Sequence, residues 1–219
     1  MKKEVKKNRM ARLYDSIAEE YDYFMKQTGH QQAQERILQR IYSEIKGRVL
    51  DIATGTGFIA KKIKANCKDV EVIGIDISGK MIEQAKRKAK EKKLKVKFLI
   101  GDAEKLNFLD KYFDLAICSL GFLWFQNKTR LLKELKRVVK KRGKIIVIEE
   151  EGETVRSKNS LKEFSPNMQK FFSKIKKLEI PVSIKEIKKK MKNSSRLEKE
   201  YRAPIDKYHS FVAMVFKVK

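Results

Sequence analysis

The sequence predicts an α/β protein with an open, mostly parallel β-sheet covered by helices on both faces. Between residues 48 and 149, short apolar runs alternate with stretches of helical periodicity. The runs are almost continuously apolar, as expected of parallel strands buried on both faces. Acids end or follow three of them, at Asp51, Asp76 and Asp102. Because open sheets of this kind bind ligands beyond the carboxyl ends of their strands, these acids predict one shared crevice.

The composition is that of one large globular domain. The chain has 219 residues, of which 42% are hydrophobic, enough for a substantial core. No apolar run approaches the roughly 20 residues that span a bilayer, and the basic start lacks the apolar segment of a secretion signal. We therefore expect a cytoplasmic protein. Cys67 and Cys118 lie far apart, which predicts buried thiols and no disulfide or metal site.

The formal net charge of +25 is the most unusual property of the composition. It is compatible with a nucleic-acid partner, because Lys and Arg that neutralise phosphates release counterions. Alternatively, the excess lysines lie on the solvent faces of helices and have no binding role. No Arg-rich cluster or alternating aromatic and basic motif marks a single binding face, so both explanations stay open.

The chain divides into four consecutive regions within one domain. They are N-terminal cap helices at 1–46, a core at 47–150, an insertion or lid at 151–182, and a C-terminal helix with two strands at 183–219. The first region opens with a basic arm. Its residues Tyr14, Ile17, Ala18 and Tyr21 recur in steps of three and four, so they share one helical face that packs on the body or closes over a cofactor.

The other expected elements follow the same periodicities. Helices are expected at about 32–44, at 58–65, after Ser78 and from about 128, and strands at 48–52, 70–76, 95–100, 113–119 and 144–149. Ser78 is placed to cap its helix, and Gly143 is expected in the left-handed conformation that ends the helix before it. The C-terminal region predicts a basic helix at 183–191 and an antiparallel pair of strands at 196–201 and 210–218.

The insertion contains an apolar, aromatic-rich stretch that is expected to cover an edge of the sheet, to form a lid over an apolar substrate, or to do both. Its apolar residues are Phe164, Met168, Phe171 and Phe172.

The turn after the first strand is the best candidate for a ligand site. Gly55 and Gly57 permit a tight turn and a close ligand approach, and with Asp76 they fit the fingerprint of a site for an adenosine cofactor, including NAD. Asp51 is unfavourable beside a pyrophosphate but pairs well with an ammonium or sulfonium group. Asp102 can accept a hydrogen bond from an adenine amino group. A cationic amino-acid nucleoside therefore fits better than a dinucleotide.

The chain resembles the class I S-adenosylmethionine-dependent methyltransferases, and most closely their ubiquinone/menaquinone biosynthesis C-methyltransferase branch. The motifs that support the resemblance lie at 14–22, 49–57, 74–81, 101–106, 113–116, 134–138 and 142–143. The resemblance implies a three-layer α-β-α Rossmann-like methyltransferase fold. Its mostly parallel seven-stranded sheet would end in a C-terminal antiparallel hairpin.

The resemblance also implies a role for each matched residue toward S-adenosylmethionine. Gly55 and Gly57 would pass under the amino-acid part, with Ala53 in the same turn and Asp51 near the ammonium group. The residues implied around the nucleoside and the methyl group are Asp76 at the ribose, Ile77 and Met81 on the adenine faces, Asp102 and Ala103 at the adenine edge, Ser119 and Leu120 on the methyl-transfer side, and Tyr14 and Tyr21 above the cofactor.

The segments that would choose the acceptor differ from the quinone enzymes. Residues 120–127 replace their polar segment with an aromatic run, in which Phe122, Trp124 and Phe125 are the candidate substrate contacts. The turn at 140–143 lacks their proline and second glycine. We expect a small, largely apolar acceptor, with an RNA or protein methyltransferase and a non-catalytic cofactor-binding subunit as alternatives.

Catalysis of methyl transfer demands little beyond in-line positioning, because the methyl sulfonium is already activated. A general base is required only for a protonated acceptor. The candidates for that role are His30, which follows the cap helix, and Glu149 with Glu150 at the end of the last core strand. The sequence leaves the acceptor atom and the oligomeric state open.

Overall fold

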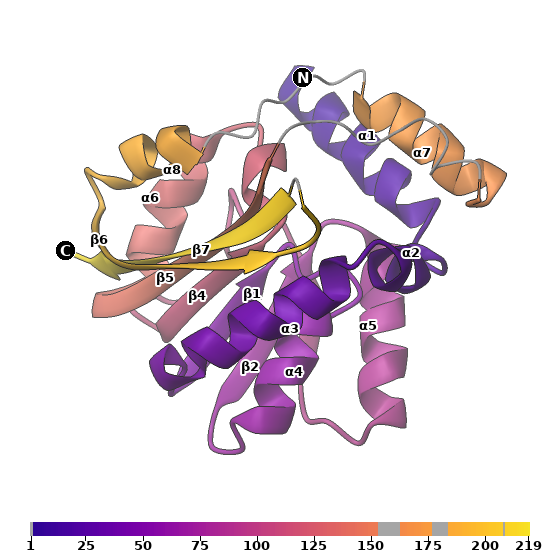
Figure 1. Ribbon diagram of the computed structural model, residues 1–219. Helices are drawn as coiled ribbons and strands as arrows, with labels where there is room; N and C mark the ends of the chain where they lie inside the picture. Colours follow the sequence, from indigo (N-terminus) through magenta and orange to yellow (C-terminus); the bar gives the residue numbers. More distant parts are fainter. Residues whose placement is uncertain (1, 153–162, 177–183, 208) are drawn as a thin grey trace.

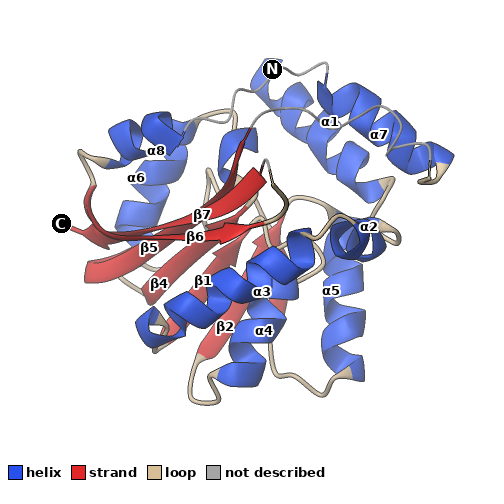
Figure 2. Ribbon diagram, viewed as in Figure 1, coloured by secondary structure: helices blue, strands red, loops and turns tan. Residues whose placement is uncertain are grey.

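The computed structural model describes residues 2–152, 163–176, 184–207 and 209–219. It is a three-layer α/β structure in which helices cover both faces of one twisted sheet (Figures 1 and 2). The α/β fold predicted from the alternating periodicities is confirmed.

The elements follow the order that the periodicities predict. The helices are α1 (Lys2–Asp15), α2 (Tyr21–Gln27), α3 (His30–Ile41), η1 (Tyr42–Glu44), α4 (Phe58–Asn66), α5 (Gly79–Glu91), η2 (Phe122–Trp124), α6 (Lys128–Val138), α7 (Pro166–Lys176) and α8 (Ile184–Met191). The strands are β1 (Arg48–Ile52), β2 (Glu71–Asp76), β3 (Lys97–Ile100), β4 (Phe113–Ser119), β5 (Val139–Gly152), β6 (Ser195–Pro204) and β7 (His209–Val218).

The sheet has seven strands in the order β3-β2-β1-β4-β5-β7-β6. The first five run parallel, with Asp51 beside Gly74 and Ile117 at the centre. β7 pairs antiparallel with β5 and β6, as predicted for the C-terminal hairpin. Because the strand order reverses between β1 and β4, their carboxyl ends open a crevice there.

Two apolar cores hold the layers together. One buries α6 and α8 against one face of the sheet, through residues such as Leu131, Leu135 and Ile187. The other buries α3, α4 and α5 against the opposite face, where Ile37 and Leu38 are fully buried. The predicted helix cap at Ser78 is also present, since its hydroxyl accepts a hydrogen bond from the Met81 N–H.

The N-terminal region differs from its prediction in two ways. The expected basic arm is helical, because α1 begins at Lys2. The expected single helix through Tyr14 and Tyr21 is two helices, since α1 ends at Asp15 and α2 begins at Tyr21. The hydroxyl of Ser16 donates to the carbonyl of Leu13 at this break and so competes with helix continuation. The shared apolar face nevertheless stays on one side of the chain.

The helix α7 packs against α1, and the two lie side by side in Figure 1. Its residues Met168 and Phe171 are buried in a cluster with Leu13, Ile17 and Phe24 of the N-terminal region. The prediction that it covers an edge of the sheet is therefore wrong. Most of the rest of the 151–182 region lies outside the described residues.

The prediction for Gly143 is also wrong. The helix α6 passes directly into β5, with Val139 already extended, so no left-handed residue ends it. Arg142 takes the positive φ, at 64°, and Gly143 lies within the long strand. The space around Gly143 explains the glycine. A Cβ there would lie 2.7 Å from Val139 Cγ1 and 2.9 Å from the Asp114 carbonyl oxygen.

We predict that Gly143→Ala destabilises the protein by about 1–3 kcal/mol, because the added methyl group overpacks this site. Urea unfolding followed by circular dichroism measures the effect. Gly79→Ala is the matched control, since its Cβ would lie 3.6 Å from the nearest atom, Ile100 Cδ1, and glycine is a poor helix former. Equal stability of the Gly143 variant and the wild type would contradict the close contacts described above.

None of the described helices is long and apolar enough to cross a membrane.

Candidate functional site

Two adjoining cavities lie at the carboxyl ends of the parallel strands. The larger has about 840 Å³ of empty space, part of it open to solvent. It is lined by Lys7, Met10, Tyr14, Tyr21, Ala53, Gly55, Ile75, Asp76, Ile77, Met81, Gly101, Asp102, Ala103, Glu104, Ser119, Leu120, Gly121, Trp124, Phe125 and Gln126. The smaller one is lined by Tyr21, Asp22, Met25, Gln31, Gln34, Asp51, Ala53, Thr54, Gly55, Thr56, Phe58, Ile59 and Ser119. The shared residues make them two parts of one site.

The turn after β1 forms the floor between the two cavities. Gly55 has a φ of 54°, and a Cβ at this position would meet no atom within 4 Å. The space above it is therefore available to a ligand. The Asp76 carboxylate at the end of β2 fixes the turn by accepting hydrogen bonds from the backbone N–H groups of Gly55, at 2.8 Å, and Ser78, at 2.9 Å.

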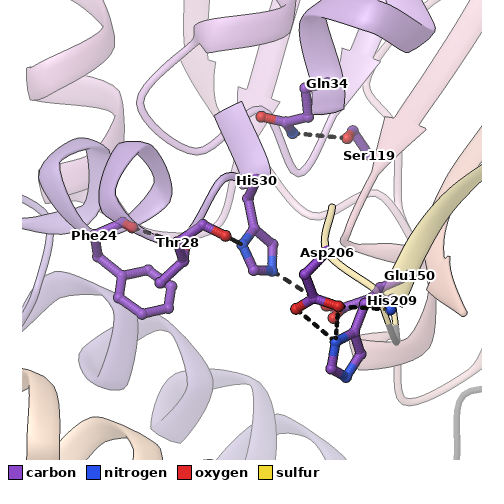
Figure 3. Close-up of polar contacts among 8 residues, drawn as sticks. All are labelled: Phe24, Thr28, His30, Gln34, Ser119, Glu150, Asp206 and His209. Carbon is purple, nitrogen blue, oxygen red and sulfur yellow. Dashed lines mark hydrogen bonds and ion pairs between the residues drawn. The ribbon is translucent and has the colours of Figure 1, made fainter. Parts of the chain in front are cut away.

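The smaller cavity is polar and contains Asp51. Its side chain is buried and accepts a hydrogen bond of 2.5 Å from the Thr54 hydroxyl. Burial, with a smaller contribution from the nearby Asp76, raises the pKa of Asp51 to about 7 against the effect of that hydrogen bond. A bound cation would favour the ionised carboxylate. Gln34 crosses from α3 and donates to the Ser119 hydroxyl at 3.0 Å (Figure 3).

At the far end of the larger cavity, an ammonium group bridges two acids. Lys7 of α1 lies 2.7 Å from Asp102 Oδ2 and 2.6 Å from Glu104 Oε2. Glu104 is buried, and its other oxygen accepts a hydrogen bond from the Asn127 N–H at 2.8 Å. Asp102 is therefore held beside the position expected for an adenine edge, but it is already paired with a lysine.

The remaining wall of the larger cavity is apolar and aromatic. Trp124 and Phe125 line it, together with Leu120 and Met10. Glu149 lies behind this wall, fully buried, and accepts hydrogen bonds from the backbone N–H groups of Phe122, at 2.8 Å, and Leu123. Glu149 therefore supports the loop that shapes the aromatic wall.

Among the described residues, His30, Glu149, Glu150, Phe122 and Gly57 lie outside the lining of both cavities. Phe122 is fully buried, and Gly57 starts α4 with a φ of 76°. Figure 3 shows His30 between two segments far from each other in sequence: its Nδ1 lies 3.1 Å from the Thr28 carbonyl oxygen and its Nε2 lies 3.3 Å from Glu150 Oε2. This position joins α3 to the end of β5 and places the imidazole away from the cavities.

The other predicted cofactor-binding residues converge on the site. All line the larger cavity except Asp51, which lines the smaller one. Sequence reasoning missed Lys7, Glu104 and Gln126, and in the polar cavity it missed Gln31 and Gln34. Glu104 was part of a motif and gave a usable signal, whereas Lys7 is one of several lysines in its segment.

The described ranges contain no group of three or more His, Cys, Asp or Glu residues arranged to hold a metal ion. Cys67 and Cys118 are free thiols. Cys118 is buried as predicted, whereas Cys67 is only partly buried, so the prediction of a buried thiol is wrong there.

Comparison with known protein families shows which proteins the core of the chain is similar to. Residues 49–143 match the family model of a methyltransferase domain. A demethylmenaquinone methyltransferase from Thermotoga maritima is 35% identical over 146 residues, which cover 65% of this chain and 62% of that protein. A ubiquinone/menaquinone biosynthesis C-methyltransferase from Geotalea daltonii is 30% identical over 150 residues, covering 66% and 64%. The match thus spans less than two thirds of these relatives.

Solved structures agree with the fold. The PH0226 protein from Pyrococcus horikoshii is 26% identical and aligns over 92% of both chains with a TM-score of 0.65. A SAM-dependent methyltransferase from Aquifex aeolicus, at 22% identity, aligns over 83% of this chain and 88% of its own with a TM-score of 0.63. The predicted Rossmann-like methyltransferase fold is confirmed.

Proposed function

We propose that this chain, which belongs to the class I S-adenosylmethionine-dependent methyltransferases, transfers a methyl group from S-adenosylmethionine to a small, largely apolar acceptor in the cytoplasm. The main support is one site with a polar end and an aromatic end, joined over the Gly55 turn. An amino-acid nucleoside and an apolar acceptor are the pair of ligands that such a site suits.

The residues of the site fit S-adenosylmethionine. Asp51, in the small polar cavity, would face the ammonium group of its amino-acid part. Asp76 would accept hydrogen bonds from the ribose hydroxyls, because a carboxylate that already holds two backbone N–H groups still has acceptor capacity. Ile77 and Met81 would enclose the adenine ring.

When bound, S-adenosylmethionine supplies a methyl group on a positively charged sulfur, which an acceptor can attack directly. The protein would then contribute orientation and exclusion of water. Tyr14 and Tyr21 are suited to this, since their rings pack edge to face with centroids 6.3 Å apart on the cavity wall. Trp124 and Phe125 would hold a flat apolar acceptor opposite them.

The proposed class of acceptor is supported by the aromatic wall of the larger cavity and by the names of two related proteins. An aromatic wall favours a ring compound over a charged polymer. Of the two relatives described above, one is named a demethylmenaquinone methyltransferase and the other a ubiquinone/menaquinone biosynthesis C-methyltransferase. We therefore take demethylmenaquinone as the first acceptor to test. The net charge of +25 makes RNA the natural competitor.

Purified protein should be incubated with S-adenosylmethionine labelled in the methyl group and, in parallel, with a short-chain demethylmenaquinone, tRNA or a cell extract. We expect the label in the solvent-extractable fraction. Label in acid-precipitable RNA or protein instead would overturn the small-molecule proposal. If calorimetry detected no binding of S-adenosylhomocysteine, the proposal that S-adenosylmethionine is the cofactor would be overturned.

A further inference from the structure

The helices α1, α2 and α7 form a small apolar body of their own above the sheet. Their buried residues pack mainly on one another, as in the contact between Tyr14 and Phe171, whose ring centroids lie 5.2 Å apart. From the rest of the described chain, Met81 and Leu120 join this cluster. Both line the larger cavity. We call α1, α2 and α7 the lid helices, and the site lies at the interface between them and the core.

Three polar contacts fasten this lid to the rim of the site. Asp15, at the end of α1, accepts hydrogen bonds from the Ser78 hydroxyl, at 2.5 Å, and the Lys80 N–H, at 3.0 Å. Asp22 of α2 is bonded to the Thr56 hydroxyl and lies 2.7 Å from Lys88 Nζ. The third contact, from Lys7, fastens the N-terminal half of α1. It differs from the others because its partners, Asp102 and Glu104, line the larger cavity next to the lysine.

The Lys7 contact is built to persist. Its side chain is 19% exposed and that of Glu104 is 4% exposed, so water screens the pair weakly. Burial alone disfavours the ammonium, but hydrogen bonds to Asp102 and Glu104 outweigh it and raise the pKa of Lys7. The backbone holds both acids in place, because Asp102 Oδ1 accepts from the Glu104 N–H at 2.8 Å.

The other carboxylate oxygen of Asp102, Oδ2, can accept hydrogen bonds from the lid and from a ligand at the same time. Oδ2 accepts one hydrogen bond from Lys7, and a carboxylate oxygen has a second lone pair. An adenine amino group at this edge would use that lone pair. The contact would therefore couple closure of α1 to the presence of the nucleoside.

We infer that Lys7 is a positioning residue, which latches α1 and its partner helices over the adenine end of the bound cofactor through Asp102 and Glu104. This inference rests on the proposed binding of S-adenosylmethionine. The latch slows cofactor release and leaves the methyl-transfer chemistry to other residues.

The test compares Lys7→Met with wild type by stopped-flow measurement of S-adenosylhomocysteine association and dissociation. Loss of a charge-assisted hydrogen bond pair should raise the dissociation rate about tenfold, while association stays unchanged or becomes faster. Lys7→Arg should restore slow release. Arg9→Met is the matched control, because Arg9 is exposed on the same helix.

A second readout separates a latch from general loosening of the fold. Limited proteolysis should cut within residues 2–20, and S-adenosylhomocysteine should protect wild type but protect Lys7→Met weakly. Equal dissociation rates for Lys7→Met and wild type would overturn the latch and leave cofactor binding intact. Failure of the wild type itself to bind the ligand would instead overturn the proposed function.

Discussion

Replacing Asp76 with asparagine is expected to weaken S-adenosylhomocysteine binding by about 100-fold, the loss that follows from weakening two hydrogen bonds to a charged group. The proposed site gives this carboxylate both ribose hydroxyls as donors. The substitution also disturbs the apo turn. Both oxygens of Asp76 accept backbone N–H groups, from Gly55 and Ser78. An asparagine amide nitrogen would have to face one of these donors, which unpins the turn on which the ligand rests.

Isothermal titration calorimetry measures the effect, and thermal unfolding shows whether the variant is folded. The matched control is Glu71→Gln, which removes a carboxylate from the opposite end of the same strand, where it forms an exposed ion pair with Arg48. That variant should bind like wild type. An Asp76→Asn protein that binds the ligand as tightly as wild type would remove the ribose-binding role.

Most of the sheet could be predicted from the sequence, because the pattern that marks a buried parallel strand lies within the strand itself. A parallel strand buried on both faces reads as a continuous apolar run, whatever its neighbours are. The start of β5 was missed for the same reason. Lys140, Lys141 and Arg142 are strongly polar, yet they belong to the strand that begins at Val139. β4 pairs on either side of these three residues, Phe113 with Val139 and Leu115 with Lys144, and the register shifts between the two pairs. Strand pairing that flanks a segment overrides the low strand propensity of its residues.

The site shows the same division between local patterns and long-range packing. Acids at strand ends could be predicted to converge, because the sheet fixes where those ends lie. The surface on which α7 packs could not be predicted, because an apolar stripe shows that a helix buries one face but does not show which surface covers that face. Lys7 could not be singled out either. Its role depends on α1 crossing the site beside Asp102, which is 95 residues away in sequence.

The second large effect concerns Glu149, the buried acid behind the aromatic wall. Burial, with a smaller contribution from the nearby Glu150, raises its pKa from 4.5 to about 8. The hydrogen bonds from Phe122 and Leu123 and the charge of Lys128 act in the opposite direction. In the unfolded chain this carboxyl group would ionise near its ordinary value. Between about pH 4.5 and 8, unfolding therefore releases a proton.

The sign of the pH dependence follows from that release. The contribution of Glu149 to stability is fully present below about pH 4.5 and is lost as the pH rises through about 8. A fully shifted group changes the free energy of unfolding by about 1.4 kcal/mol per pH unit. Asp51 acts in the same direction, since its pKa is raised to about 7. A comparison of matched variants is therefore needed to isolate the contribution of Glu149 to the pH dependence of stability.

Glu149→Gln is the variant that separates the two acids. Its amide oxygen can still accept from the Phe122 N–H, but it no longer ionises, so its stability relative to wild type should rise by about 1 kcal/mol per pH unit between pH 5 and 8. Urea unfolding at pH 5, 6, 7 and 8 measures this. Glu151→Gln, whose carboxylate pairs with Arg202 at the surface, should show a nearly constant difference. A constant difference for Glu149→Gln as well would mean that Glu149 is already ionised in the folded protein, and that the loop behind the aromatic wall is held by a charge.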